Sequence, residues 1–472
     1  MRISSVSFTR DLSKAYIYVE NAAARELRIS GVYVGGEDAT SSADVKQAEL
    51  KPGDKTLVVI ERGRPFRRGE VVKLRVEAGQ VAASAEVRAL PAEFPVGIYG
   101  GDEVLSNRQA LMEVLEMGLD TLVAGSDKLE AAQRYGLRVV AYAPRAGESI
   151  DLDAVRRYAG HPALLAWYVV DEPDIWEVGG RLPEGWTAKW TGEVRRADPV
   201  TPTYIVLCDP WSLERFASLP DILAVDPYPV SHLPLRYVEF MARRAVRAAV
   251  PRPVWLIPQA FRHGRPPRSG GWWWNRFPTP EEERLMVFMG LGQGLKGVIY
   301  FTYHSFIDNP DDPVEGVSSS HVDAAVLRRG IARMSGELHA LGRLLAFSDV
   351  FTETRSAAAW SRSGSVEVAS LVAGDEAVVL VLVNHGYVST PRGFEVAPAR
   401  EVVVEARIPR WIEVLGAYRV TEWGVEDVEL KVEDGVARIT LPRLETAAAV
   451  VLAASDSAYR ALVEEWRIWR RY

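Results

Sequence analysis

The middle of the chain alternates short apolar segments with helical stretches, and this rhythm constrains the fold more than any other feature of the sequence. Eight such units follow one another between about Phe94 and Phe347 of the 472 residues. The predicted strands are Pro95–Tyr99, Thr121–Ala124, Arg138–Ala143, Leu164–Val170, Thr203–Leu207, Ile222–Val225, Val254–Pro258 and Gly297–Tyr303. The predicted helices are Ser106–Met117, Lys128–Tyr135, Leu152–Ala159, Thr187–Arg196, Leu213–Leu219, Leu235–Val250, Pro280–Leu291 and Ala324–Leu345.

These units predict a closed α/β barrel. Wholly apolar strands are typical of a parallel sheet that is buried under helices, and eight strand–helix units in about 250 residues match a (β/α)₈ TIM barrel. A doubly wound open sheet is the alternative. It is disfavoured because no glycine-rich phosphate loop follows the first strand.

The two flanks of this region are predicted to be β-sandwiches. Short β-branched or alternating runs separated by turn signals indicate strands at Ala15–Glu20, Leu27–Val34, Thr56–Glu61, Val71–Glu77 and Val81–Val87, and later at Ala377–Val383, Glu401–Ile408, Val428–Val432 and Ala447–Ala453. The amphipathic segment Ser457–Tyr472 predicts a closing helix. We therefore expect an N-terminal β-sandwich (1–92), a barrel (93–347), a C-terminal β-sandwich (348–456) and a C-terminal helix (457–472).

Composition narrows the function. With 56 Lys+Arg against 63 Asp+Glu, the formal net charge is 56 − 63 = −7, which disfavours nucleic acid and anionic membranes as partners. No apolar run reaches the roughly 20 residues of a membrane span. The single cysteine, Cys208, excludes an intrachain disulfide and a Cys-rich zinc site. Without a signal-peptide core at the N-terminus we expect a cytoplasmic protein, or a secreted one if a signal has been removed. The sequence does not indicate an oligomeric state.

Chemistry in a barrel belongs at the carboxyl ends of the strands, and carboxylates follow two of the apolar strands directly. Asp171, Glu172 and Pro173 follow the fourth strand, and Asp226 follows the sixth. A carboxyl group beside aromatic surface and other carboxylates has a raised pKa, which suits a general acid. The structural alternatives are a loop or helix-capping cluster at Asp171–Glu172 and a turn-forming Asp-Pro at Asp226.

Other strand ends carry groups that could contact a substrate. Asp102 follows the first strand, although helix capping would also explain it, and Tyr228 lies in the proline-flanked loop after Asp226. Gln259 follows the seventh strand and can orient a hydroxyl group but cannot be a nucleophile. Tyr303 ends the eighth strand and His304 follows it; either could hydrogen-bond a substrate, and a structural role explains each equally well.

Three consecutive tryptophans, Trp272, Trp273 and Trp274, occupy a glycine-flanked loop after the seventh strand. Three such side chains are hard to bury together, and an exposed aromatic face can stack on the apolar face of a sugar ring. The alternative is that one or two of these side chains pack the loop against the barrel. The loop therefore predicts a sugar-binding cleft.

At these residues the sequence resembles the (β/α)₈-barrel glycoside hydrolase clan, over roughly half of the chain. The resemblance is carried by WYVVDEP at strand four, DPYP at strand six and GVIYFTY at strand eight, and QAF at strand seven is similar to a divergent branch of glycosidase-like proteins. Retaining members of the clan carry Asn-Glu-Pro at strand four, with the glutamate as acid/base. The resemblance therefore implies that Glu172 is the general acid, with Asp in place of Asn at position 171.

The chain departs from the clan at strand seven, where Gln259 stands in the position of the nucleophilic glutamate. Three routes remain. The first is inversion, with Glu172 as acid and Asp226 as base, which needs carboxyl groups about 6.5–9.5 Å apart. The second is retention with Asp226 or Asp102 as nucleophile. The third is substrate assistance, as in the similar hexosaminidases, with Asp171 orienting an N-acetyl group while Glu172 protonates the leaving oxygen.

The sequence thus predicts a glycoside hydrolase that acts on an oligo- or polysaccharide. Glu172, Asp226 and Asp171 are the expected catalytic residues, and neither a cofactor nor a bound metal is implied. Metal-dependent hydrolysis is disfavoured because it would require several histidine ligands, and the chain has seven His in all. A non-catalytic carbohydrate-binding barrel is the remaining alternative, because the strand-seven glutamate is missing.

Overall fold

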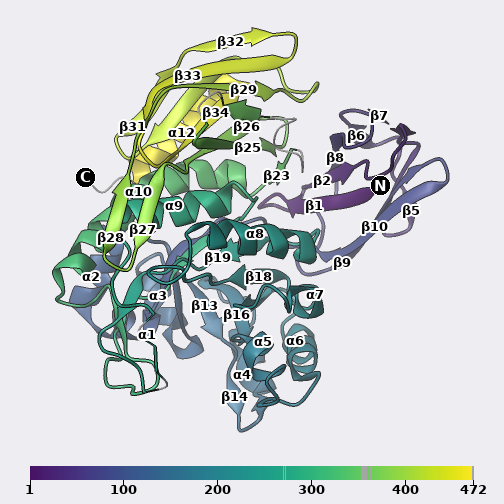
Figure 1. Ribbon diagram of the computed structural model, residues 1–472. Helices are drawn as coiled ribbons and strands as arrows, with labels where there is room; N and C mark the ends of the chain where they lie inside the picture. The colour runs from purple at the N-terminus through teal and green to yellow at the C-terminus, as the bar shows by residue number, and fades with distance from the viewer. Residues whose placement is uncertain (269, 272, 352–358, 362–363, 470–472) are drawn as a thin grey trace.

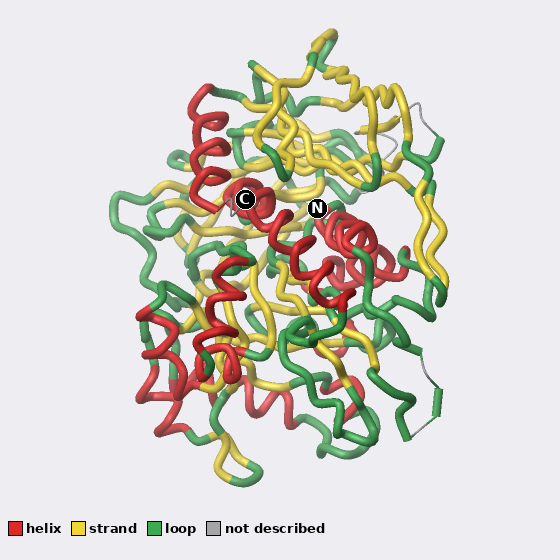
Figure 2. Tube along the Cα trace, turned by 90° about the vertical axis from the view of Figure 1, so that its left-hand side faces the viewer, coloured by secondary structure: helices red, strands yellow, loops and turns green. Residues whose placement is uncertain are grey.

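A central barrel is flanked by antiparallel sheets from both ends of the chain in the computed structural model, which describes residues 1–472 except 269, 272, 352–358, 362–363 and 470–472. Figure 1 shows the N-terminal sheets in purple at the right, the barrel below and the C-terminal sheets in yellow-green at the top. Figure 2 shows the same stacking of strands above the barrel from the side. The predicted fold class is confirmed.

The barrel is closed, and its eight parallel strands follow one another in chain order around the ring. They are β11 Val96–Tyr99, β12 Thr121–Gly125, β13 Arg138–Tyr142, β16 Leu164–Val170, β17 Thr203–Leu207, β18 Ile222–Val225, β19 Val254–Leu256 and β21 Val298–Tyr300. Every residue of β16, β17 and β18 is buried. These strands therefore bury both faces, as a helix-covered parallel barrel requires.

Helices connect these strands and cover the barrel. They are α1 Gly101–Ser106, α2 Arg108–Glu116, η1 Ser126–Lys128, α3 Leu129–Arg134, α4 Leu152–Tyr158, α5 Pro173–Trp176, α6 Trp186–Ala197, α7 Leu213–Phe216, α8 Arg236–Ala249, α9 Pro280–Leu291 and α10 Val322–Leu345. Helix α9 begins with a capping box: Thr279 Oγ1 accepts from the Glu282 N–H at 3.2 Å, and Glu282 accepts from the Thr279 N–H at 3.0 Å. Arg276 donates to both Glu282 oxygens, at 2.6 and 2.7 Å, and so anchors the end of the tryptophan loop. The barrel loops carry two small antiparallel sheets: the hairpin of β14 Arg145–Ala146 with β15 Ser149–Ile150, and the pair of β20 Phe261–His263 with β22 Val314–Gly316, which come from different loops.

The N-terminal part forms two four-stranded sheets, in the orders β1-β2-β8-β6 and β10-β9-β4-β5, with the short pair β3-β7 beside them. The strands are β1 Arg2–Phe8, β2 Lys14–Glu20, β3 Leu27–Arg28, β4 Gly31–Val34, β5 Glu37–Asp38, β6 Ala43–Val45, β7 Glu49–Leu50, β8 Lys55–Glu61, β9 Val71–Ala78 and β10 Val81–Arg88. The sequence pattern missed β1, whose serines interrupt its apolar run. The predicted strand Leu27–Val34 is divided into β3 and β4.

The C-terminal part forms a six-stranded sheet, β23-β25-β26-β34-β30-β31, and a four-stranded sheet, β24-β29-β33-β32, with the hairpin β27-β28. The elements are β23 Ser348–Val350, β24 Ala359–Ser361, β25 Val366–Ala373, β26 Ala377–Asn384, β27 Tyr387–Thr390, β28 Gly393–Val396, β29 Ala399–Arg407, β30 Gly416–Thr421, β31 Gly424–Val428, β32 Leu430–Glu433, β33 Val436–Leu444, β34 Ala447–Ala453 and the closing helix α12 Asp456–Trp469. The single strand predicted at Val428–Val432 is wrong, because the chain passes there from the six-stranded sheet to the four-stranded one.

Buried polar contacts join the two ends of the chain. Lys55 Nζ lies 2.5 Å from Asp349 Oδ2, and Ser4 donates to the same oxygen at 2.5 Å. The Tyr18 hydroxyl donates to the carbonyls of Phe347 and Val372. Among the described helices, none combines the length and the apolar character needed to cross a membrane.

Candidate active site

The end of β16 brings two carboxylates to the mouth of the barrel through an unusual backbone conformation. Glu172 has φ 40° and ψ 54°, in the left-handed region that a non-glycine residue rarely adopts. Pro173, the first residue of α5, restricts the backbone before it. The Glu172 N–H donates to the Val206 carbonyl of β17 at 3.1 Å, which ties this turn to the neighbouring strand. Strained backbone of this kind, which costs about 1–3 kcal/mol, concentrates at functional sites.

Asp174 fixes the end of β17 against the end of β16. Its Oδ2 accepts from the backbone N–H groups of Cys208 and Asp209, at 2.8 and 2.6 Å. Cys208 is the residue that directly follows β17, so these bonds hold its side chain beside Glu172. Burial raises the pKa of Asp174 to about 6, against the lowering effect of the two N–H donors.

Glu172 and Asp226 meet at the carboxyl ends of β16 and β18. One oxygen of each carboxyl group and the Cys208 Sγ all lie within 4.8 Å of one another. Asp226 is 6% exposed, and its Oδ1 has no hydrogen-bond partner in the described part of the protein. The pair therefore combines deep burial with close approach of two acids.

Burial and mutual repulsion raise the pKa of both acids. Burial, followed by the charge of Asp171, raises the pKa of Glu172 to about 7, while hydrogen bonding with Asp226 opposes the rise. Burial, followed by the charges of Glu172 and Asp171, holds the pKa of Asp226 well above its usual range. Two such groups cannot both ionise easily, so the pair retains a proton at neutral pH.

Asp171 completes the acidic group and faces the same pocket. It accepts a hydrogen bond from the Tyr168 hydroxyl of β16. Burial raises the pKa of Asp171, and the Tyr168 hydroxyl and the Arg145 charge work against that rise. All three carboxylates that the sequence predicted to be catalytic thus lie together at one pocket.

The pocket has a volume of about 390 Å³ and an aromatic wall. It is lined by Tyr99, Asp171, Glu172, Ile175, Val206, Asp226, Tyr228, Ile257, Phe261, His263, Pro267, Gly270, Gly271, Trp273, Trp274, Phe301, Asp311, Asp312 and Val314. No lysine or arginine lines it in the described part of the chain.

The tryptophan loop divides into one packed and one exposed ring. Trp274 packs edge-on against Tyr228, with 6.4 Å between ring centroids, and its Nε1 donates to the Tyr228 carbonyl at 2.9 Å. Trp273 is 58% exposed and stacks on His232, with 5.9 Å between centroids. Trp272 lies outside the described residues. Of the described pair, Trp273 is therefore the ring with a face available for stacking on a ligand.

Four of the predicted substrate-contacting residues do not line this pocket. Gln259 is fully buried, and its amide bonds the backbone of Val230 on both sides, donating at 2.5 Å and accepting at 2.9 Å. Tyr303 is buried and donates to Glu113 at 2.9 Å. His304 Nδ1 bonds the Thr302 hydroxyl at 2.7 Å, and the exposed Asp102 accepts from the Gly125 N–H at 3.2 Å. Each of these four side chains has a protein partner, and its contact with a substrate stays a prediction.

The sequence pattern missed Cys208, which lies beside the acid pair, and several residues of the pocket lining. Cys208 had no recognisable motif around it. His263 Nε2 pairs with Asp312 Oδ1 at 3.0 Å across the pocket wall, and Asp311 adjoins them. The run DNPDDP after strand eight was the available signal for these acids. A second group that could hold a metal, Glu239 with Glu367 and His385, lies apart from the pocket lining.

No family model matches the chain, and no curated protein matches it. Solved structures do resemble it. A Paenibacillus cycloisomaltooligosaccharide glucanotransferase, in complex with cycloisomaltoheptaose, aligns over 95% of this chain and 99% of its own, with TM-score 0.50 and 10% identity. An Eisenbergiella tayi GH2 β-galacturonidase aligns over 70% and 72% (TM-score 0.37, 13% identity), and an uncultured Clostridium β-glucuronidase over 71% and 69% (0.38, 14%). At these identities the likeness is one of fold.

Proposed function

We propose that the protein hydrolyses O-glycosidic bonds of an oligo- or polysaccharide, with Glu172 and Asp226 as its two catalytic carboxyl groups. The observation that carries the proposal is a close pair of buried carboxyl groups in an aromatic pocket at the carboxyl ends of the barrel strands. Glycosidases need one acid to protonate the leaving oxygen and a second carboxylate at the anomeric carbon. The structural similarity to sugar-acting barrels supports the same class of ligand.

Glu172 is the general acid, because burial raises its pKa to about 7 and so keeps a large share of it protonated up to that pH. Asp226 is the second carboxylate. One oxygen of each group lies within 4.8 Å of the other and the two groups are hydrogen-bonded, which is closer than the roughly 6.5–9.5 Å separation that leaves room for a water in inverting enzymes. This spacing favours direct attack by Asp226 over activation of a water, and so it reverses the order of the first two routes expected from the sequence. Asp102 is not favoured as a nucleophile, since it does not line the pocket.

The charge of the pocket favours a neutral sugar over a uronic acid. Five carboxyl groups line it, those of Asp171, Glu172, Asp226, Asp311 and Asp312, and His263 is the one potentially cationic residue among its described lining residues. An anionic sugar would need a cation opposite its carboxylate to offset desolvation. We therefore expect neutral glycans to be cleaved in preference to galacturonides and glucuronides.

Substrate assistance is the second candidate, because Asp171 is held by the Tyr168 hydroxyl and lines the pocket next to Glu172. In that case Asp171 orients an N-acetyl group, which attacks the anomeric carbon. This route predicts activity restricted to N-acetylhexosaminides, whereas attack by Asp226 does not.

The experiment is hydrolysis of neutral, N-acetylated and uronate glycans and aryl glycosides by the wild type and Glu172→Gln, with the first product anomer read by NMR. A retained anomer from neutral substrates is expected. Glu172→Gln should lower kcat by about 10²–10⁴-fold on natural glycans, and much less on aryl glycosides whose leaving groups need no protonation. An inverted product would instead indicate that Asp226 acts as a base that activates a water. Sugar binding with no hydrolysis on any substrate would reject the proposal in favour of a carbohydrate-binding barrel.

A further inference from the structure

Three donor atoms of different chemical kinds converge where β16, β17 and β18 end. An oxygen of Glu172, the sulfur of Cys208 and an oxygen of Asp226 lie within 4.8 Å of one another. Each is positioned by its own strand and loop, and the Asp174 carboxylate holds the Cys208 backbone in place. This convergence is a property of the folded barrel, since Glu172 and Cys208 lie 208 − 172 = 36 positions apart in the sequence and Cys208 and Asp226 lie 226 − 208 = 18 apart.

An independent feature of the cluster points to a cation. Asp226 is only 6% exposed, and its buried Oδ1 has no hydrogen-bond partner among the described residues. An unsatisfied buried carboxylate oxygen costs about 1–3 kcal/mol or more. No lysine or arginine among the described residues lines the pocket to neutralise it. A bound cation would take the place of the shared proton and supply the missing partner of Asp226 Oδ1.

We propose that Glu172, Cys208 and Asp226 form a binding site for a thiophilic divalent cation of the Zn²⁺ and Cd²⁺ class. One sulfur and two carboxylate oxygens are ligands that Zn²⁺ accepts, whereas Mg²⁺ and Ca²⁺ select oxygen alone. A tetrahedral ion with bonds of about 2.1–2.3 Å holds its ligands roughly 3.4–3.6 Å apart. Donor atoms within 4.8 Å reach that spacing by small side-chain rotations.

The cation would occupy the same carboxyl oxygens that hold the shared proton. Binding therefore removes the acid that Glu172 supplies, so the cation inhibits hydrolysis rather than supporting it. This consequence rests on the proposed function, whereas the binding itself does not and is measured without any substrate.

The test is titration of the full chain, freed of metal by a chelator, with Cd²⁺ alone. Cys208 is the one cysteine in the sequence, so the ultraviolet charge-transfer absorption of a cadmium–thiolate bond reports this site and no other. We expect saturation at one Cd²⁺ per chain. Two separate variants, Asp226→Asn and Glu172→Gln, keep the thiol. Each should weaken Cd²⁺ binding by at least about 10-fold, because removing even an outer-shell partner of a metal costs about that much in affinity.

His385→Gln is the matched control, because it alters the other group of potential ligands, Glu239 with Glu367 and His385. It should leave the cadmium–thiolate titration unchanged. Circular dichroism of each variant checks that it is folded. The proposal is overturned if no charge-transfer band develops, or if both carboxyl variants bind Cd²⁺ as tightly as the wild type, which would mean that the thiol acts alone. If the band saturates at one equivalent but substrate cleavage fails in every assay, the cation site stands and the glycosidase proposal falls.

Discussion

Two aspartates bracket strand β18, and the protein treats them in opposite ways. Asp221 precedes the strand at the amino end of the barrel, and Asp226 follows it at the carboxyl end. They are almost equally buried, at 8% and 6% exposure. Burial alone would therefore raise both pKa values alike. The difference between them arises from what surrounds each carboxyl group.

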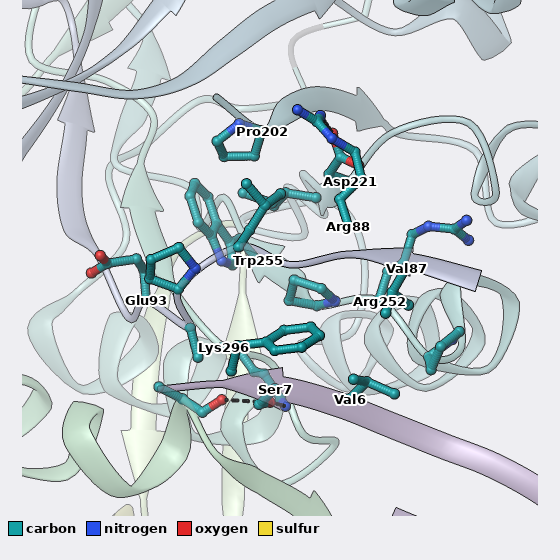
Figure 3. A pocket seen from close by; sticks show the side chains of 18 of the residues that line it. Val6, Ser7, Val87, Arg88, Glu93, Pro202, Asp221, Arg252, Trp255 and Lys296 are labelled. Carbon is teal, nitrogen blue, oxygen red and sulfur yellow. Dashed lines mark hydrogen bonds and ion pairs between the residues drawn. The ribbon is translucent and has the colours of Figure 1, made fainter. Parts of the chain in front are cut away.

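Asp221 is fully matched by donors. Arg88 donates to it at 2.6 Å, Arg195 at 3.0 Å and the Thr203 backbone and hydroxyl each at 2.8 Å. Burial raises its pKa, but Arg88, Arg195 and the two Thr203 hydrogen bonds together outweigh burial and hold the pKa below its usual range. Figure 3 shows Arg88 and Asp221 side by side in the small cavity, about 90 Å³, between the N-terminal sheets and the foot of the barrel.

Asp226 instead faces Glu172, and its pKa rises. The fold supplies hydrogen-bond donors to the buried carboxylate at one end of β18. At the other end it leaves Asp226 Oδ1 without one among the described residues, which lowers stability. Pairs of acids with raised pKa values are characteristic of catalytic sites. Asp226 therefore differs from Asp221 in its surroundings and not in its burial: no arginine or lysine side chain is among the described residues that line its pocket.

The largest expected effect separates the two aspartates by activity. Asp226→Asn should lower kcat/KM on a neutral glycan by about 10²–10⁴-fold, because it removes one of the two carboxyl groups that we propose to be catalytic. Its free energy of unfolding, measured by urea denaturation, should equal or exceed that of the wild type, since an unsatisfied charge is lost. Activity within a few-fold of the wild type would show that Asp226 resembles Asp221 in having only a structural role.

The next largest effect is on stability at the other end of β18. Arg88→Met should lower the free energy of unfolding by about 3 kcal/mol at pH 7, the lower end of the 3–5 kcal/mol for breaking a buried pair, because Arg195 still faces Asp221. The lowered pKa of Asp221 means that its contribution is present at neutral pH and is lost as the pH falls through that pKa. The difference between variant and wild type should therefore shrink in acid. A loss below about 1 kcal/mol would contradict the assignment.

The pH dependence of stability distinguishes the acid pair with a smaller effect. Glu172 has a folded pKa of about 7 against 4.5 for the ordinary group, so between these pH values the folded chain keeps a proton that the unfolded chain releases. Stability should therefore fall as the pH rises from about 4.5 to 7, by about 1–3 kcal/mol. Glu172→Gln should flatten this fall, whereas Arg88→Met should retain it. Equal slopes in the wild type and Glu172→Gln would remove the basis for a shared proton.

The sequence predicts the position of a site residue well where that residue lies just after a buried strand. The bounds of β16, β17 and β18 agree with the apolar runs, so Glu172 and Asp226 were found as the residues that follow buried strands. Cys208 follows such a strand as well, but a lone thiol carries no pattern, and its approach to Glu172 is visible only once the ring closes.

The predicted strand bounds are wrong at the seventh and eighth strands, which end earlier than their apolar runs. β19 ends at Leu256 and β21 at Tyr300, so the residues beyond them follow irregular backbone instead of strand alternation. Phe301 consequently lines the pocket while Tyr303 points into the helix-packed core. No periodicity in the sequence encodes that change of direction, and the same holds for Gln259, which is bonded to the backbone of the neighbouring loop.

The smallest expected effect tests whether the exposed ring of the tryptophan loop binds the ligand. Trp273→Ala should raise KM by about 3–10-fold and leave kcat nearly unchanged, because a stacking contact worth about 1 kcal/mol is made equally in the ground and transition states. Trp274→Ala is the contrasting variant. Trp274 packs on Tyr228 and holds its carbonyl, so its loss should disturb the pocket and lower kcat as well. If Trp273→Ala lowers kcat with KM unchanged, the ring serves the geometry of the acid pair and not the binding of sugar.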